Sequence, residues 1–256
     1  MSERISRHLW TIGSFLLIFI AWDLTVRIFG IAAYLLPGPL EVADSLVEHW
    51  RELATQTLWT AGAILAGFAA AAVVAIPLAM LIVVSPVMER LLYPPMVATQ
   101  SIPKIALAPL FVVWFGFGLM PKVAVAFLIA FFPVVIDTMV GLRSIDPGMM
   151  QLARSMGAPP YRIFLRLRLP HALPMIFGGL KVASTLAVVG ALTGEFIGSD
   201  KGLGYLLLQA SGNLNTALLF ATLVVLSVLA MVFFYAVEAV ERAMIPWHVS
   251  HRGHHA

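Results

Sequence analysis

Cysteine is absent from the 256-residue sequence, which excludes a disulfide framework and any thiolate metal site. Charged residues are also scarce. Asp, Glu, Lys and Arg make up 11% of the chain, whereas ordinary soluble domains carry about 25%. Hydrophobic residues make up 61%, and the mean hydropathy is +0.94. The composition therefore places the chain in a lipid bilayer.

Sequence motifs for nucleotide binding and metal-dependent hydrolysis are missing as well. The chain has neither a G-x-x-x-x-G-K-[ST] phosphate loop nor an H-E-x-x-H pair. Its basic residues flank apolar stretches instead of forming a stripe with aromatic residues, which argues against nucleic-acid binding. The histidine-containing tail has no carboxylate to orient the rings, and we expect a solvated tail there instead of a metal site; its histidines are His248, His251, His254 and His255.

Six apolar stretches are long enough to cross a bilayer core, which takes about 20 helical residues. They cover residues 9–29, 57–84, 89–117, 121–143, 172–198 and 215–241. No cleavage site of small residues follows the first stretch, so we expect it to be retained as a span. A short amphipathic helix is predicted within residues 31–56. With no repeat and no linker, residues 1–256 are expected to form a single all-α membrane domain.

Lysine and arginine are distributed unevenly between the segments that connect the six stretches, and cytoplasmic segments carry the excess. An N-terminus in the cytoplasm leaves only four of these residues in outer segments, which are Arg27, Arg51, Lys122 and Lys201. It leaves ten in cytoplasmic segments, which are Arg4, Arg7, Arg90, Arg143, Arg154, Arg162, Arg166, Arg168, Arg242 and Arg252. The sequence therefore predicts that both termini and the loop 144–171 are cytoplasmic.

Polar and ionisable residues inside apolar spans are rare and need partners or water. The candidates for a translocation path are Gln100, Lys104, Asp137, Lys181 and Glu195. Depths of about 9 and 14 Å from the cytoplasmic ends of their spans predict an ion pair between Asp137 and Lys181. Glu195 lies near the outer end of its span, where it is expected to shape an outer gate.

The third stretch contains Pro94, Pro95, Pro103 and Pro109, and each interior proline removes a backbone donor. Two interpretations remain open for this stretch, a structural kink or the kinked wall of a conducting path. Two interpretations also remain open for Lys104, which lies directly after Pro103. It either stabilises an anionic solute in transit or binds the backbone carbonyls that the break frees. In the fifth stretch, close helix packing is predicted by a repeat of every fourth residue, at Gly190, Gly194 and Gly198.

The loop 144–171 has the signals of two short helices that meet at a corner. Asp146 is a good N-cap before Pro147, and Gly157 is placed as a left-handed C-cap. A second helix is expected to start at Pro159-Pro160 and to end at Pro170. Arginines flank the corner at the level of the anionic inner leaflet. Exposed apolar residues at the corner suit a groove on a soluble partner, whereas an ordinary interfacial loop is the other interpretation.

This loop resembles the cytoplasmic EAA loop of permease subunits of bacterial ABC importers. That pattern reads E-A-A, three residues, Gly, nine residues and then I-x-L-P. The matching positions are Gln151, Leu152, Ala153, Gly157, Leu167, Leu169 and Pro170. The spacing from Gly157 to Pro170 fits without a gap, whereas Gln151 and Leu152 replace the Glu and the first Ala of the pattern. The stretches "LLPGPLEVADSL", "SIPKIALAPLFVVWFGFG", "GEFIGSDKGLGYLL" and "ERAMIPWH" are similar to the nitrate, sulfonate, taurine and bicarbonate group of these permeases.

The resemblance implies a type I ABC importer permease in the bacterial inner membrane, working as a homodimer. A separate ATPase subunit would bind ATP and Mg, and a periplasmic or lipid-anchored solute-binding protein would deliver a small, anionic solute. By this analogy Gly157 makes the corner, and Met156, Ala158 and Tyr161 contact the ATPase. The other loop residues assigned to coupling are Gln151, Ala153, Leu169 and Pro170.

Two other classes of function are weighed against this one. A self-contained secondary transporter or channel would need internal repeats or carboxylates for a coupling ion at mid-depth, and Asp137 is a lone acid there. A membrane-embedded enzyme would need a metal or general-base constellation, and no histidine lies within a predicted span. The sequence therefore favours a transport subunit that depends on an ATPase in another chain.

Overall fold

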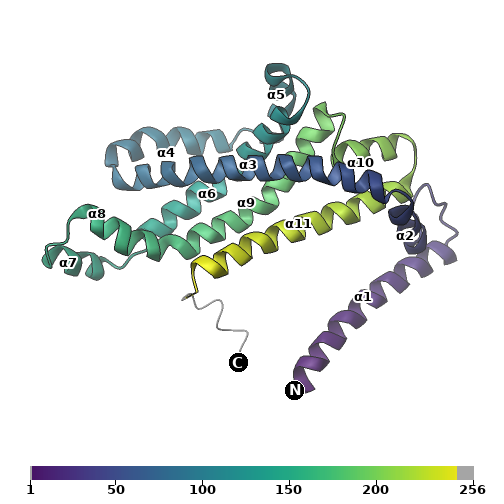
Figure 1. Cartoon of the computed structure of the whole chain (residues 1–256), viewed down its shortest axis with the longest axis horizontal. Helices are drawn as coiled ribbons and strands as arrows, with labels where there is room; N and C mark the ends of the chain where they lie inside the picture. The colour runs from purple at the N-terminus through teal and green to yellow at the C-terminus, as the bar shows by residue number, and fades with distance from the viewer. Residues whose placement is uncertain (1, 247–256) are drawn as a thin grey trace.

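The computed structural model describes residues 2–246, and every regular element in this part of the chain is helical. In Figure 1 the long helices α3, α9 and α11 run side by side, with α7 and α8 at one end of the bundle and α10 at the other. The elements are α1 (Ser2–Ile28), α2 (Pro39–Glu48), α3 (Trp50–Val84), α4 (Pro86–Gln100), η1 (Lys104–Leu107), α5 (Ala108–Phe115), α6 (Leu119–Arg143), α7 (Pro147–Ser155), α8 (Pro160–Ile163), η2 (Phe164–Arg168), α9 (Leu169–Gly198), α10 (Leu203–Gly212) and α11 (Thr216–Met244).

Four helical stretches in the described part of the chain are long and apolar enough to cross a membrane. They are α3, α6, the continuous stretch from α8 through η2 to α9, and α11. These correspond to four of the predicted spans, 57–84, 121–143, 172–198 and 215–241. The predicted span 9–29 is helical as part of α1, which projects from the bundle in Figure 1. That α1 crosses the membrane stays a prediction.

The predicted span 89–117 is broken in two, as its prolines indicate. Helix α4 and the pair η1–α5 together are apolar enough for one span, but they are bent by 90°. The break falls at Pro103, whose backbone is extended (ψ 99°) directly before η1. Pro94 and Pro95 lie within α4 without ending it. One proline of the four therefore marks the break, because a proline has no N–H to continue the helix.

Helices α6 and α9 form the most extensive contact in the bundle, and glycines bring them together. A Cβ on Gly190 would lie 2.6 Å from the Cα of Ala126, and one on Gly194 would lie 2.7 Å from the Cα of Lys122. A step of four residues along α9 is thus matched by a step of four back along α6. Such close backbone approach is how apolar helices associate in lipid, where burial from water contributes little.

The same register continues to the other end of this helix pair. A Cβ on Gly179 would lie 2.8 Å from the Cβ of Asp137, and one on Gly141 would lie 2.8 Å from the Cβ of Met175. The third predicted packing glycine, Gly198, faces Val112 of α5 instead of α6. Within the chain, Gly179, Gly190 and Gly194 of α9 therefore serve the contact to α6, and Gly198 serves the contact to α5.

The expectation that Pro170 ends the helix after α8 is wrong. Helix α8 runs into a π-helical turn, η2, and then directly into α9, with Pro170 in the first turn of α9. The N–H of Leu169 reaches back to the carbonyl of Phe164, five residues earlier. This wider turn makes room for the proline ring. It also accommodates the loss of the hydrogen bond that proline cannot make, because proline has no N–H. The result is one helical stretch from Pro160 to Gly198.

The amphipathic helix predicted within residues 31–56 is α2, ten residues long. It buries Val42 and Ser45 and packs against α11 and α3. The chain turns at His49, so Trp50 and the residues after it belong to α3 instead of extending α2.

The α6–α9 register predicts opposite effects for two glycines of α9. We expect Gly190→Ala to lower the free energy of unfolding by about 1–3 kcal/mol, because the new methyl group would overlap the backbone of α6. In Gly178→Ala the methyl group meets no atom within 4 Å, and alanine favours a helix over glycine. The measurement is unfolding in detergent by circular dichroism. Equal changes in the two variants would contradict the register.

Candidate functional site

The corner at the end of α7 is closed by backbone hydrogen bonds. Gly157 has φ +74°, the left-handed conformation that favours glycine. Its N–H donates to the carbonyl of Arg154 (2.9 Å), and the N–H of Ala158 donates to the carbonyl of Ala153 (3.1 Å). This pair of bonds is a Schellman C-cap. The predicted left-handed C-cap at Gly157 is confirmed, and backbone hydrogen bonds within the loop fix the shape of the corner.

The start of α7 is capped by a side chain. Asp146 accepts a hydrogen bond from the N–H of Met149 through Oδ1, at 3.0 Å, and Pro147 takes the first helical position. The predicted N-cap is therefore confirmed. A helix of nine residues is marginal alone, and caps at both ends compensate for its shortness.

The corner presents large apolar side chains to its surroundings. Met156 is 77% exposed and Tyr161 is 59% exposed. Gln151 and Gly157 are exposed too, whereas Ala158, Leu169 and Pro170 are half-buried and Ala153 is buried. The residues expected to meet the ATPase thus divide into an outward-facing set and a set that holds the loop against the bundle.

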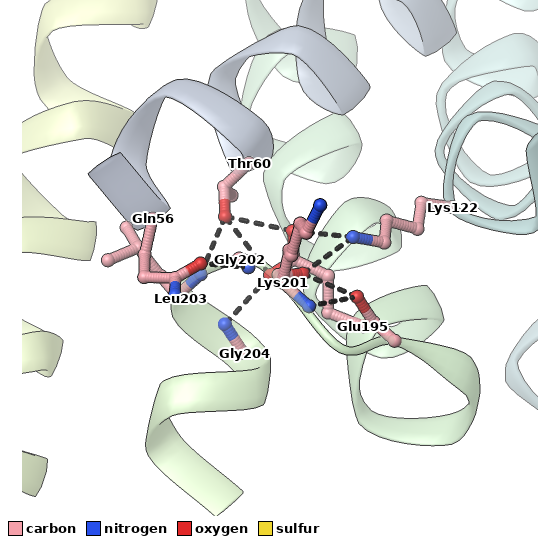
Figure 2. A network of polar contacts seen from close by, with 9 residues as sticks. Gln56, Thr60, Lys122, Glu195, Lys201, Gly202, Leu203 and Gly204 are labelled. Carbon is pink, nitrogen blue, oxygen red and sulfur yellow. Dashed lines mark hydrogen bonds and ion pairs between the residues drawn. The ribbon is translucent and has the colours of Figure 1, made fainter. Parts of the chain in front are cut away.

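A buried polar network joins four segments at the α10 end of the bundle (Figure 2). Its centre is Glu195 of α9, which is 1% exposed. The hydroxyl of Thr60 in α3 donates to Oε1 (2.8 Å), and the N–H of Gly204 in α10 donates to Oε2 (2.7 Å). Lys122 of α6 places Nζ 3.8 Å from Oε1. The carboxylate is thus paired and hydrogen-bonded, as a buried charge requires.

The same network fixes the turn between α9 and α10. Lys122 donates from Nζ to the carbonyl of Lys201 (2.6 Å). The N–H of Gly202 donates to Oε1 of Gln56 (2.6 Å), and the N–H of Leu203 donates to the hydroxyl of Thr60 (2.8 Å). Three transmembrane helices are therefore tied to one short turn. A change in that turn must be accompanied by a change in α3, α6 or α9.

Part of this network was beyond the sequence-based expectations. Glu195 was predicted near the outer end of its span, but its partners were not identified. Gln56 and Thr60 are four residues apart on α3, which places them on one helix face. Two polar residues on one face of an apolar helix are the signal that identifies them in retrospect.

Lys104 lies at the break between α4 and α5. Its Nζ is 4.7 Å from the ring centroid of Phe132 in α6, and the side chain is half-buried. Among the described residues it donates no hydrogen bond, so it does not bind the carbonyls that the break frees. Its neighbour Gln100 is exposed at the end of α4. The ammonium group therefore lies over the face of an aromatic ring.

The predicted ion pair between Asp137 and Lys181 is wrong. Lys181 of α9 pairs with Glu241 of α11, with Nζ and Oε2 2.7 Å apart. Asp137 lies opposite Gly179 in the α6–α9 contact, and two residues along a helix turn a side chain by about 200°. Lys181 therefore faces α11. The two depths were matched in the prediction, but the direction around the helix was not considered.

Asp137 is half-buried and makes no hydrogen bond or ion pair with any other described residue. No group of three or more metal-binding side chains occurs between residues 2 and 246. The tail histidines, His248, His251, His254 and His255, lie outside the described residues.

The sequence model of the family described as binding-protein-dependent transport system inner membrane components matches residues 71–246. This chain belongs to that family.

The sequence of this permease is similar to those of curated relatives along most of its length. It is 37% identical to the formylaminopyrimidine transport permease protein ThiX of Halalkalibacterium halodurans, over 91% of this chain and 93% of that protein. It is 35% identical to the riboflavin transport system permease protein RibX of Chloroflexus aurantiacus, over 92% and 88%. Identity to the taurine transport system permease protein TauC of Escherichia coli is 27%, over 93% and 89%. The resemblance to ABC importer permeases is confirmed.

A solved structure shows the same fold. It is an inward-facing form of the MetNI methionine ABC transporter, matched with a TM-score of 0.66 over 77% of the permease and 97% of the matched chain. Sequence identity is 23%, so this likeness concerns the fold alone. The expected all-α, type I importer-like architecture is confirmed.

The network around Glu195 predicts a large loss of stability for a small chemical change. Glu195→Gln replaces one carboxylate oxygen by an NH₂ group. This NH₂ group faces a hydrogen-bond donor, and the neutral side chain no longer compensates the charge of Lys122. We expect the free energy of unfolding to fall by about 2 kcal/mol. Asp137→Asn is the matched control and should change it by less than about 0.5 kcal/mol, because Asp137 has no polar partner. Unfolding in detergent compares the two; equal losses would mean that the network is not stabilising.

Proposed function

We propose that this ABC importer permease forms the translocation path for a small solute and is driven by a separate ATPase that docks on the loop 144–171. The family assignment and the absence of a phosphate loop in this chain support a division of labour between two subunits. ATP and Mg are bound by the ATPase in this proposal.

The corner at Gly157 is the observation that carries the proposal. It places exposed Met156 and Tyr161 at the tip of two short helices whose shape is held by backbone hydrogen bonds. A rigid, apolar, protruding surface loses little conformational entropy when it enters a groove on a partner. The tip also leads directly into α9, so a displacement of the loop reaches the membrane span.

The α7–α8 end is cytoplasmic in this proposal, with the remainder of the chain in a bacterial inner membrane. The excess of arginines in residues 144–171 supports this orientation. The direction of α11 supports it too. This helix ends toward the α7–α8 end (Figure 1), which places its C-terminal end on the same side as the loop, as predicted for a cytoplasmic C-terminus. The α10 end then faces the periplasm, where a solute-binding protein delivers the cargo.

A second copy of the chain completes the path. Helix α5, the turn after it and the first turn of α6 expose a group of large apolar side chains, which are Val113, Trp114, Phe115, Phe117 and Met120. The exposure of this apolar face in a single subunit supports a homodimer in which the partner covers it.

The relatives support a small solute as the cargo, and Lys104 supports an anionic group on it. Relatives are named for formylaminopyrimidine, riboflavin, taurine and aliphatic sulfonates, all small organic solutes. The half-buried ammonium of Lys104, without a carboxylate partner among the described residues, supports an anionic group on the cargo. Sulfonates, taurine, nitrate and bicarbonate fit this charge.

The corner predicts that Gly157→Pro uncouples the permease from its ATPase. Proline holds φ near −65°, whereas Gly157 has φ +74°; the change also removes the N–H that closes the C-cap. We expect ATP-driven uptake and co-purification of the ATPase to fall about tenfold or more. Gly157→Asn is the control, since asparagine tolerates this conformation and would meet open space. Undiminished, ATP-independent uptake by Gly157→Pro would reject the proposal in favour of a self-contained transporter.

A second experiment tests Lys104 on the path. Lys104→Met removes the charge but keeps an apolar side chain over Phe132, and we expect uptake of an anionic cargo to fall about tenfold. Lys104→Arg keeps the charge and should retain most of the rate. Uptake of taurine, an alkanesulfonate and riboflavin is compared in proteoliposomes that contain the ATPase and the binding protein. An unchanged rate for every solute in Lys104→Met would remove Lys104 from the path.

A further inference from the structure

A cavity of about 490 Å³ lies beneath the loop, between α7–α8–η2 and the corner where α3 meets α4. The volume is in the range of small-ligand sites, about 300–1,000 Å³. Its walls are mixed, with Val84 and Phe164 among the apolar residues and two arginines among the polar ones. The cavity is separate from the Glu195 network, which lies at the other end of the bundle (Figure 1).

The two arginines that line the cavity are Arg154 of α7 and Arg168 of η2. The Nε of Arg168 is buried and has no hydrogen-bond partner within the described residues. Arg154 has no ion pair or hydrogen bond from its side chain to any other described residue. A buried donor without an acceptor is costly, and such groups in folded proteins are almost always satisfied by a protein partner, by ordered water or by a ligand.

The negative charge inside the cavity is already neutralised. Glu89 is the one carboxylate among the lining residues. It is engaged by Arg143, with Nη2 of the arginine 2.8 Å from Oε1 of the glutamate. Arg143 is not itself part of the lining. Arg154 and Arg168 therefore give the cavity an excess of positive charge with no acceptor supplied by the described protein.

We propose that this cavity binds a phosphate group, held by Arg154 and Arg168. Guanidinium groups bind phosphate through paired, charge-assisted hydrogen bonds, and the planar fork of arginine suits its tetrahedral oxygens. Two sources supply this chemistry, a phospholipid headgroup or a soluble phosphate. The cavity lies between the corner where α3 meets α4 and the α7–α8 end of the bundle, and its apolar lining suits the carbon atoms next to a phosphate.

The position of the site gives it a consequence for the loop. A phosphate in the cavity contacts the arginines of α7 and η2 while the α3–α4 corner forms the opposite wall. Occupancy therefore ties the loop to the membrane bundle. This inference concerns binding and does not depend on which solute the permease carries or on its ATPase.

The experiment uses the full chain purified in a neutral detergent at constant ionic strength. It is titrated with short-chain phosphatidylglycerol, with diacylglycerol of the same chain length, and with inorganic phosphate. Bound mass is read by native mass spectrometry and stabilisation by thermal unfolding. We expect phosphatidylglycerol to bind and diacylglycerol, which lacks the phosphate, not to bind. In Arg154→Gln/Arg168→Gln the apparent affinity should fall about tenfold or more.

Arg166→Gln is the matched control, because Arg166 lies on the same turn but does not line the cavity; it should keep the affinity. Phosphatidylglycerol binding without any response to inorganic phosphate identifies a lipid headgroup as the source. If inorganic phosphate stabilises the chain, and if this effect is lost in Arg154→Gln/Arg168→Gln, the source is a soluble phosphate. Binding of neither probe, or an equal loss in Arg166→Gln, overturns the proposal. If the double variant fails to fold, Arg154→Gln, an exposed change on α7, carries the same comparison.

Discussion

The antiparallel contact between α6 and α9 is the interaction on which the rest of the structure depends. Glycines at 190 and 194 of α9 and at 141 of α6 let the two backbones approach to a distance that no side chain would allow. In lipid there is little hydrophobic force between apolar helices, so stability comes from this close packing and from the few polar groups that it brings together. The register of the pair decides which polar groups those are. It sets Glu195 within reach of Lys122, sets Asp137 against Gly179, and turns Lys181 away toward α11.

Glu195, Lys181 and Lys104 occupy three distinct environments in the bundle. Near the α10 end, Glu195 has its acceptor atoms filled by an amide, a hydroxyl and an ammonium group. Between α9 and α11, Lys181 and Glu241 form an isolated pair. At the helix break, the face of Phe132 is the one partner of Lys104 among residues 2–246. The first two are satisfied within the subunit and stabilise it. The third is left available, and a group held without a counter-charge in an apolar setting is where a passing ligand gains the most from binding.

Local signals in the sequence were enough for most of the fold and for the corner of the loop. The spans 57–84, 121–143, 172–198 and 215–241, the N-cap at Asp146 and the left-handed Gly157 each depend on a few neighbouring residues, and each is found where it was predicted. Two failures have a common cause. The partner of Lys181 and the partners of Glu195 are set by the rotation of one helix against another, which depth alone does not determine. The prediction that the helix ends at Pro170 failed for a different reason. A π-helical turn adds room that the usual rule for proline does not consider.

The unbroken stretch from Pro160 to Gly198 gives the permease a mechanical property. With 39 residues it is a strut roughly 58 Å long, at about 1.5 Å of rise per residue. One tip carries the corner and the other carries Glu195, and the glycine contacts with α6 lie between them. Because the contacts with α6 run from Gly179 to Gly194, the strut is held along most of α9 and cannot turn without α6. In the proposed mechanism, a displacement of the corner is therefore expected to move α6 and α9 together as one unit.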